Sequence, residues 1–298
     1  MLNKYLFYFL LVPSLFLNTN AAEFRWNFSD ICELVKRLEI NGEIVIGDSA
    51  KFSNLLKKAE TKYQEYGCQK KDFRFGFDAG IELNSKGGDV NESMKIGYLI
   101  REREWQTFVY PNQICMSSCV FILAAGVVRA GMGKVGIHRP YLQDLKDNLS
   151  TFEIKKIRDE SIRSWKNYFN DMDVSETLVD AMLSIEPSKI KILTVSELEF
   201  FRLDGIDANW DEKMTAKNAR QYNLTSSEYR KKHIISFEKC WNSTDKNLDI
   251  LKCDYMTFLA ITSQEYDSRK SRVSKCLGKE PDNKIYESCM FKTLVLNQ

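Results

Sequence analysis

The sequence predicts an α/β fold followed by a small helical, cysteine-containing region at the C-terminal end. Between residues 77 and 140, strand-like apolar segments alternate with helix-like segments. Such alternation is typical of parallel strands joined by right-handed crossovers. The C-terminal region differs, because cysteines recur there at a spacing of thirteen, at Cys240 and Cys253 and again at Cys276 and Cys289. The 298 residues are enough for one sizeable core and an appendage.

Composition excludes few classes of protein, but it gives no support for a nucleic-acid partner. The chain has 43 basic and 41 acidic residues and a formal net charge of +2. A nucleic-acid-binding surface normally shows as an excess of positive charge. We therefore expect no nucleic-acid partner.

Residues 1–22 have the layout of a secretory signal. Lys4 precedes an apolar stretch over residues 5–17, and small residues follow up to Ala22. The apolar part is short for a bilayer span, so we expect cleavage near Ala22, with an uncleaved anchor as the alternative. No second apolar run approaches membrane-spanning length, which predicts a periplasmic or secreted protein with no membrane span after cleavage.

All eight cysteines lie after that segment. An even number in an exported chain indicates disulfides. No Cys-x-x-Cys pair occurs, and the two histidines lie far from most cysteines, so no metal site is predicted. Cys32 and Cys68 are candidates for one pair. Cys115 and Cys119 are open to two interpretations, a disulfide or two buried thiols.

The elements before residue 77 are predicted from periodicity and turn residues. The apolar positions of DICELVKRLEI, residues 30–40, follow the helical i, i+3, i+4, i+7 pattern. Asn41-Gly42 indicates a turn, residues 43–48 a strand, and residues 52–67 an amphipathic helix that ends at Gly67.

From residue 77 onwards the pattern predicts strand, helix, strand, helix, strand. The strands are expected at 77–85, 106–112 and 129–141, and the helices at 91–105 and 115–126.

The remaining residues predict mostly helices. Residues 144–185 indicate two amphipathic helices. Residues 192–207 indicate a short strand and a helix capped by Thr194 or Ser196, with Glu197 in its first turn. A linker or exposed helix should follow Trp210.

Reactive groups follow three of the predicted strands. Gly87-Gly88, Ser117 and His138 all fall at the carboxyl ends of strands, where the sites of parallel sheets gather. A serine nucleophile needs a base and donors for the oxyanion. His138 could be the base, and backbone N–H groups of the glycine pair and of Ser118 could be the donors.

Each of these features alone is common in proteins with no such chemistry. A glycine pair is usually a turn, a serine before a helix is usually a cap, and a histidine at a strand end is usually only hydrogen-bonded. Their joint placement at successive strand ends favours the functional interpretation.

Three segments, NSKGGDV, CMSSCVFILAAG and VGIHRPY, together resemble the proteolytic subunit of Clp protease within the Clp/crotonase superfamily. The sequence is most similar to exported Clp-like serine hydrolases whose nucleophile lies in a Cys-x-Ser-x-Cys setting. Lys86 replaces the proline of the family pattern. The resemblance covers about residues 40–207, and residues 225–298 lie outside it.

The resemblance implies a ββα spiral fold and a catalytic domain over residues 23–210, with a cystine-rich helical region over 225–298. It also implies peptide-bond hydrolysis with Ser117 as nucleophile, His138 as base, and Gly87, Gly88 and Ser118 around the oxyanion. A peptide or protein substrate, no cofactor and a homo-oligomer follow from the same likeness. Because exported proteins meet little ATP, hydrolysis should be independent of ATP.

The third catalytic group is the point where the sequence departs from the family. Ile190 and Lys191 lie where an acidic residue is expected, and Glu186 is the nearest preceding carboxylate. We therefore predict Glu186. Two alternatives stay open, a Ser–His dyad without a carboxylate and a lysine base. The candidate lysines are Lys134, Lys189 and Lys191, while Asp204 and Asp207 come only after the following helix.

Two other functions compete with a peptidase. A binding or scaffold protein would keep the fold with little catalysis, and the missing acid favours it. Acyl-CoA chemistry of the crotonase type uses a similar pair of oxyanion donors. Export and the combination of Ser117 with His138 argue against acyl-CoA chemistry.

Overall fold

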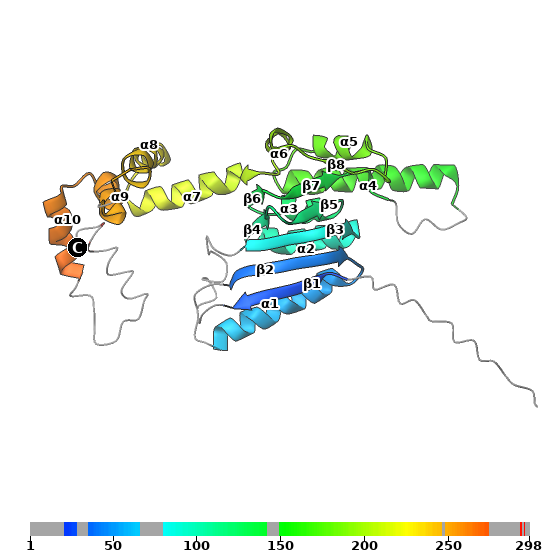
Figure 1. Cartoon of the computed structure of the whole chain (residues 1–298), viewed down its shortest axis with the longest axis horizontal. Coiled ribbons are helices and arrows are strands. Elements are labelled where there is room, and N and C mark those ends of the chain that lie inside the picture. The colour runs from blue at the N-terminus through cyan, green and yellow to red at the C-terminus, as the bar shows by residue number, and fades with distance from the viewer. Residues whose placement is uncertain are drawn as a thin grey trace, which may run out of the picture. The chain divides into compact units, whose positions relative to one another are not determined.

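The computed structural model describes residues 21–28, 35–65, 80–141, 149–245 and 248–273, with Thr293 and Val295. The chain divides into two compact units, Met1–Asp207 and Ala208–Gln298 (Figure 1). Most of the predicted signal segment and the cysteines Cys32, Cys68, Cys276 and Cys289 lie outside the described residues.

The first unit is a mixed α/β structure, which confirms the predicted class at this level. Its strands are β1 (Glu23–Phe28), β2 (Val35–Ile44), β3 (Gly80–Gly88), β4 (Gln106–Val109), β5 (Ile114–Met116), β6 (Val128–Gly131), β7 (Lys134–Ile137), β8 (Lys191–Ile192) and β9 (Gly205–Ile206). Its helices are α1 (Asp48–Glu65), α2 (Val90–Glu102), α3 (Cys119–Ala124), α4 (Thr151–Asp171), α5 (Thr177–Leu183) and α6 (Val195–Phe200).

Strand β3 is the centre of the sheet, because it changes partner along its length. On one edge it pairs with β2. On the other edge its first residues, Gly80–Glu82, pair with β4, and Ser85 pairs with β5. The order β8-β7-β5-β3-β4-β6-β9 results, with β2 and β1 branching from β3. All pairs among the strands from β2 to β7 are parallel. The ββα spiral that the resemblance implies stays a prediction.

The helix predicted for residues 30–40 is wrong, because residues 35–44 form strand β2. Leu38 and Ile40 are both fully buried and lie two positions apart, which is the period of a strand. The pairing of β2 with β3 on one edge and with β1 on the other outweighs the helical spacing of the apolar residues. The turn predicted at Asn41-Gly42 is also wrong, because both residues lie within β2, and the strand predicted for residues 43–48 ends at Ile44. The predicted amphipathic helix is present as α1, which begins at Asp48.

The segment predicted as one strand over residues 129–141 is two strands. β6 pairs with β4, and β7 pairs with β5, so the two strands lie on different partners. Gly133 lies between the two strands and packs closely on the loop after β4, since a Cβ there would lie 2.2 Å from the backbone oxygen of Tyr110. The change of partner depends on pairing with β4 and β5, so the sequence of residues 129–141 alone did not indicate it.

Helix α4 covers the core through Trp165, Tyr168 and Phe169, which are buried at helical spacing. The Tyr168 hydroxyl donates a 2.7 Å hydrogen bond to the backbone oxygen of Phe121 in α3. Burial is the main reason why the pKa of Tyr168 lies well above its ordinary value. Gly97 of α2 leaves room for this hydroxyl, because a Cβ there would lie 1.8 Å from it.

Gly97→Ala is expected to lower the free energy of unfolding by about 1–3 kcal/mol, because the added methyl overpacks a filled core. Chemical denaturation measures this loss. Tyr168→Phe in the same chain removes the clashing oxygen, so the double variant should be more stable than the sum of the single effects. Strict additivity of the two changes would contradict the proposed packing.

The second unit consists of helices in its described part. They are α7 (Ala208–Gln221), α8 (Ser226–Ser236), the π-helical turn η1 (Phe237–Trp241), α9 (Ile250–Leu259) and α10 (Ser263–Val273). A disulfide between Cys240 and Cys253 joins η1 to α9. Tyr222 stacks on Phe258 with ring centroids 4.9 Å apart. Across the described residues of both units, no helix is long and apolar enough to cross a membrane.

Candidate active site

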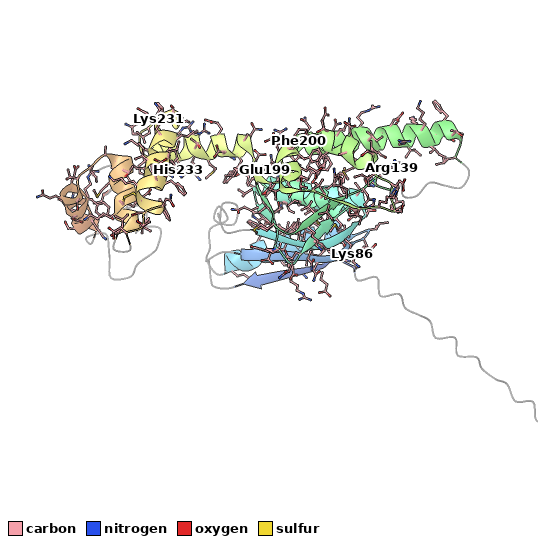
Figure 2. The ribbon with its side chains drawn as sticks, turned by 45° about the horizontal axis from the view of Figure 1, so that its top comes forward. Lys86, Arg139, Glu199, Phe200, Lys231 and His233 are labelled. Atoms are coloured by element: carbon pink, nitrogen blue, oxygen red, sulfur yellow. A yellow bond between two sulfur atoms is a disulfide. The ribbon has the colours of Figure 1, made fainter. Side chains whose placement is uncertain are left out.

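The predicted site residues lie together at the carboxyl ends of three neighbouring strands. β7, β5 and β3 are adjacent and parallel, with Met116 opposite Gly136 and Cys115 opposite Ser85. Ser117 is the first residue after β5, and His138 is the first residue after β7. Because the two strands are adjacent and parallel, these residues lie at the same end of the sheet. Lys86, before Gly87, and Arg139, after His138, lie toward this same end of the unit in Figure 2.

Ser117 lies in a sharp turn between β5 and α3, and the predicted helix over residues 115–126 is shorter than expected. The helix begins only at Cys119, and Ser117 has a backbone φ of +55°. A residue other than glycine rarely adopts this left-handed conformation, and strain of this kind concentrates at functional sites. The Ser117 N–H donates to the backbone oxygen of Gly136 at 2.8 Å, which holds the turn against β7.

A disulfide between Cys115 and Cys119 spans this turn. Its two Cα atoms lie 5.2 Å apart, and both cysteines are fully buried. Of the two interpretations left open by the sequence, the disulfide is the one present. It links the middle residue of β5 to the first residue of α3, with Ser117 between them.

Gly87 packs directly against the Ser117 turn. A Cβ on Gly87 would lie 2.5 Å from the Met116 oxygen and 2.7 Å from the Ser117 Cβ, and the φ of Gly87 is +94°. Only glycine fits there. The Gly87 N–H donates to the Ser85 Oγ at 3.0 Å. Gly88 is equally restricted, because a Cβ on it would lie 2.0 Å from the Ile44 oxygen.

Ser118 caps the N-terminus of α3 with its backbone. N–H groups in the first turn of a helix have no partner within the helix, which makes the Ser118 N–H a suitable oxyanion donor. A Cβ on Gly87 would lie 2.9 Å from this nitrogen, so the glycine turn and the helix start are in close contact. The Ser118 side-chain oxygen is buried and has no hydrogen-bond partner among the described residues.

His138 is 7% exposed, and its Nδ1 lies 2.9 Å from the backbone oxygen of Arg139. A carbonyl oxygen can only accept, so Nδ1 carries the hydrogen and Nε2 keeps its lone pair in the neutral ring. Arg139 is itself held by α5 and the residues after it. Its N–H donates to the Ile185 oxygen at 3.1 Å, and its Nε donates to the Leu183 oxygen at 2.9 Å.

Glu186 follows Ile185, whose oxygen accepts from the Arg139 N–H, but the Glu186 side chain is 62% exposed and pairs with Lys189 at 2.9 Å. No interaction between Glu186 and His138 is present in the described part of the chain. The predicted orienting role of Glu186 therefore stays a prediction. The Arg139 oxygen was not foreseen, because a backbone carbonyl gives no signal in a sequence.

The lysines considered as alternative bases are all exposed. Lys189 is paired with Glu186, and Lys191 is paired with Glu197. Lys134 begins β7, at the end of that strand opposite to His138. A lysine base needs a desolvated site that lowers its pKa, and none of the three has one.

Asp207 is buried, but it belongs to a structural cluster. It pairs with Arg101 and lies 3.6 Å from Arg129. Arg129 donates to the backbone oxygens of Ala124 at 2.9 Å and Arg202 at 2.7 Å. Burial, followed by the charge of Arg101, lowers the pKa of Arg129 to about 10. The second late carboxylate, Asp204, accepts from the N–H of Gly205.

A cavity of about 130 Å³ lies beside Ser117. Residues from the end of β3, the N-terminus of α2, the Ser117 turn, the loop after β7 and α4 line it. They include Gly88, Asp89, Tyr141, Ile157 and Trp165. Sequence periodicity indicates that Trp165 is on a buried helix face, but it does not indicate that this face borders the site.

The N-terminus of α2 is firmly held at this cavity. The Asp89 Oδ1 accepts from the Glu92 N–H at 2.8 Å, as an N-cap does. Glu92 in turn accepts from the Ser49 N–H and from Lys95, each at 2.8 Å. Burial raises the pKa of Glu92, but the hydrogen bonds from Lys95 and Ser49 outweigh this and lower it to about 2. Of the two carboxylates, only that of Asp89 belongs to a residue that lines the cavity.

No group of three or more His, Cys, Asp or Glu side chains among the described residues is placed to hold a metal ion.

Two comparisons by sequence found nothing, since no protein-family model and no curated protein matches the chain. Among solved structures, one similar chain is a mutant of the 1510-N membrane-bound stomatin-specific protease, with a TM-score of 0.37 and 18% identity over 59% of this chain and 82% of that one. Another is a mutant of ClpP1 from Listeria monocytogenes, with a TM-score of 0.39 and 17% identity over 57% of this chain and 88% of that one. Likenesses at such low TM-scores and identities assign no function to this chain.

Proposed function

We propose that this chain is a serine peptidase in which Ser117 is the nucleophile and His138 is the general base. The observation that carries the proposal is the strained Ser117 turn, with φ of +55°, tied by a hydrogen bond to β7 immediately before His138. A serine in this conformation costs free energy in the folded state, and strain of this kind clusters at active sites. Here the strained serine lies beside the end of the strand that leads into a histidine.

The proposed reaction proceeds through an acyl-enzyme. The Ser117 Oγ attacks the carbonyl carbon of the peptide bond, and the His138 Nε2 takes the hydroxyl proton. The N–H groups of Gly88 and Ser118 stabilise the oxyanion that forms. The imidazolium then gives its proton to the leaving amine, and water, activated by the same Nε2, releases the acid product.

In this mechanism the Arg139 oxygen takes the orienting role that we predicted for Glu186. It accepts the Nδ1 hydrogen of His138 at 2.9 Å and so selects the tautomer with a free Nε2. A neutral carbonyl stabilises an imidazolium less than a carboxylate does. We therefore expect a slower enzyme than one with an aspartate in this position. Gly87 is not assigned a donor role, because its N–H already donates to Ser85. Its role is to pack against the Ser117 turn, which only a residue without a Cβ can do.

We also propose that the protein acts in an oxidising, exported compartment without ATP. The buried Cys115–Cys119 disulfide at the nucleophile turn and the Cys240–Cys253 disulfide support this, because disulfides rarely persist in the cytosol. The signal-like residues 1–22 are the second support. Assembly into a homo-oligomer belongs to the same proposal.

A fluorophosphonate probe, which reacts only with an activated serine, tests the peptidase. The wild-type protein should be labelled, Ser117→Ala should not be labelled, and Ser118→Ala should still be labelled, because only the backbone of Ser118 takes part. Intact mass of the labelled protein measures this. Folded wild-type protein that takes no label would overturn the proposal.

A binding or scaffold protein is the second candidate. It is favoured by one observation, that the orienting partner of His138 is a carbonyl oxygen and not a carboxylate. The same labelling experiment separates the two functions.

A further inference from the structure

Among the described residues that line the cavity beside Ser117, Asp89 alone carries a charge. Asp89 is 9% exposed, and its Oδ1 is engaged with the Glu92 N–H. A carboxylate has capacity for about four hydrogen bonds, so the cap leaves Asp89 able to accept from a bound group.

Asp89 at the start of α2 makes the cavity more favourable for a cationic group than for an anionic one. The N-terminus of a helix attracts anions, but here the carboxylate of Asp89 already takes the position of the anion. An acidic side chain entering the cavity would meet a like charge at short range, which is repulsive. The nearest lysine of the helix, Lys95, is paired with Glu92 at 2.8 Å and is not part of the lining.

The walls of the cavity suit a long side chain with a cationic end. Ile157 and Val90 offer apolar surface for an alkyl stem. The rings of Trp165 and Tyr141 also line the cavity, and an aromatic face attracts a cation. The amide of Asn91 adds a neutral acceptor.

The cavity also borders the atoms that would react. Ser117 and Gly88 line it together with the groups named above. A peptide whose carbonyl carbon lies at the Ser117 Oγ would therefore direct the side chain of that same residue into this space.

We infer that this cavity binds a lysine or arginine side chain of the residue whose carbonyl Ser117 attacks, and that Asp89 determines this specificity. The inference rests on the proposed peptidase function and names its substrate class.

Two sets of fluorogenic peptide amides test it, one with lysine or arginine and one with leucine or norleucine at the attacked residue. The wild-type protein should favour the basic set by about 10- to 100-fold in kcat/KM, the range expected for a hydrogen bond to a charged group. Asp89→Asn keeps an efficient helix cap and removes the charge. It should still be labelled by the fluorophosphonate probe, with the preference reduced to less than about threefold.

Asp249→Asn is the matched control, because Asp249 is also an N-cap and accepts from the Lys252 N–H at the start of α9. This variant should retain the full preference. Cleavage with no preference for basic residues, or a preference that survives in Asp89→Asn, would overturn the inference and leave the peptidase standing. Absence of both labelling and cleavage in the wild-type protein would overturn the peptidase and the inference together.

Discussion

His138→Gln is expected to reduce kcat/KM for peptide hydrolysis by about 10²- to 10⁴-fold, the usual contribution of a general base. Glutamine cannot take the proton of Ser117, although it is close to histidine in size. Steady-state hydrolysis and the rate of fluorophosphonate labelling should fall together, because both need an activated Ser117. An unchanged labelling rate would exclude His138 as the base.

Glu186→Gln is the matched comparison for this experiment. Because the Glu186 carboxylate is largely exposed and pairs with Lys189, we expect kcat/KM to change by less than about threefold, as for a surface ion pair. A loss comparable with that of His138→Gln would instead assign the third catalytic role to Glu186. The Arg139 oxygen would then be only a hydrogen-bond partner of the resting imidazole.

Removing the disulfide at the nucleophile turn, by Cys115→Ala together with Cys119→Ala, is expected to have the second large effect. Closing such a short loop stabilises the folded state by about 2 kcal/mol in the loop-entropy relation. The stronger effect should be on kcat, because Ser117 holds a strained φ between the two cysteines. A displacement of about 1 Å at a reacting group can cost about 10²-fold in rate.

Cys240→Ala with Cys253→Ala is the control, because it removes a disulfide from the second unit. Its stability loss should be of similar or larger size, while kcat for peptide hydrolysis should stay within about twofold of the wild-type value. Denaturation curves and hydrolysis rates at a temperature where both variants are folded make the comparison. Equal effects of the two pairs on kcat would contradict a positioning role for Cys115–Cys119.

Several elements were predictable because their signals are local. The helix α1 and the start of α6 follow from residue spacing and type, since Thr194 was one of two expected caps and Glu197 was expected in the first turn. The structure selects Thr194, which bonds reciprocally with Glu197. β2 was not predictable in the same way. Its apolar residues satisfy the helical pattern in part, and only pairing with β3 on one edge and β1 on the other selects the strand.

The sequence by itself determined which residues are available for chemistry: a glycine pair, a serine between two cysteines and a histidine, each at or just after the end of a strand. It could do so because residue types and strand ends are local properties of the chain. Only the tertiary structure decided the conformation of Ser117, the partner of His138 and the wall that Asp89 and Trp165 contribute beside them. These depend on how β3, β5 and β7 align and on where α4 returns to the sheet, and such long-range packing leaves no local trace in the sequence.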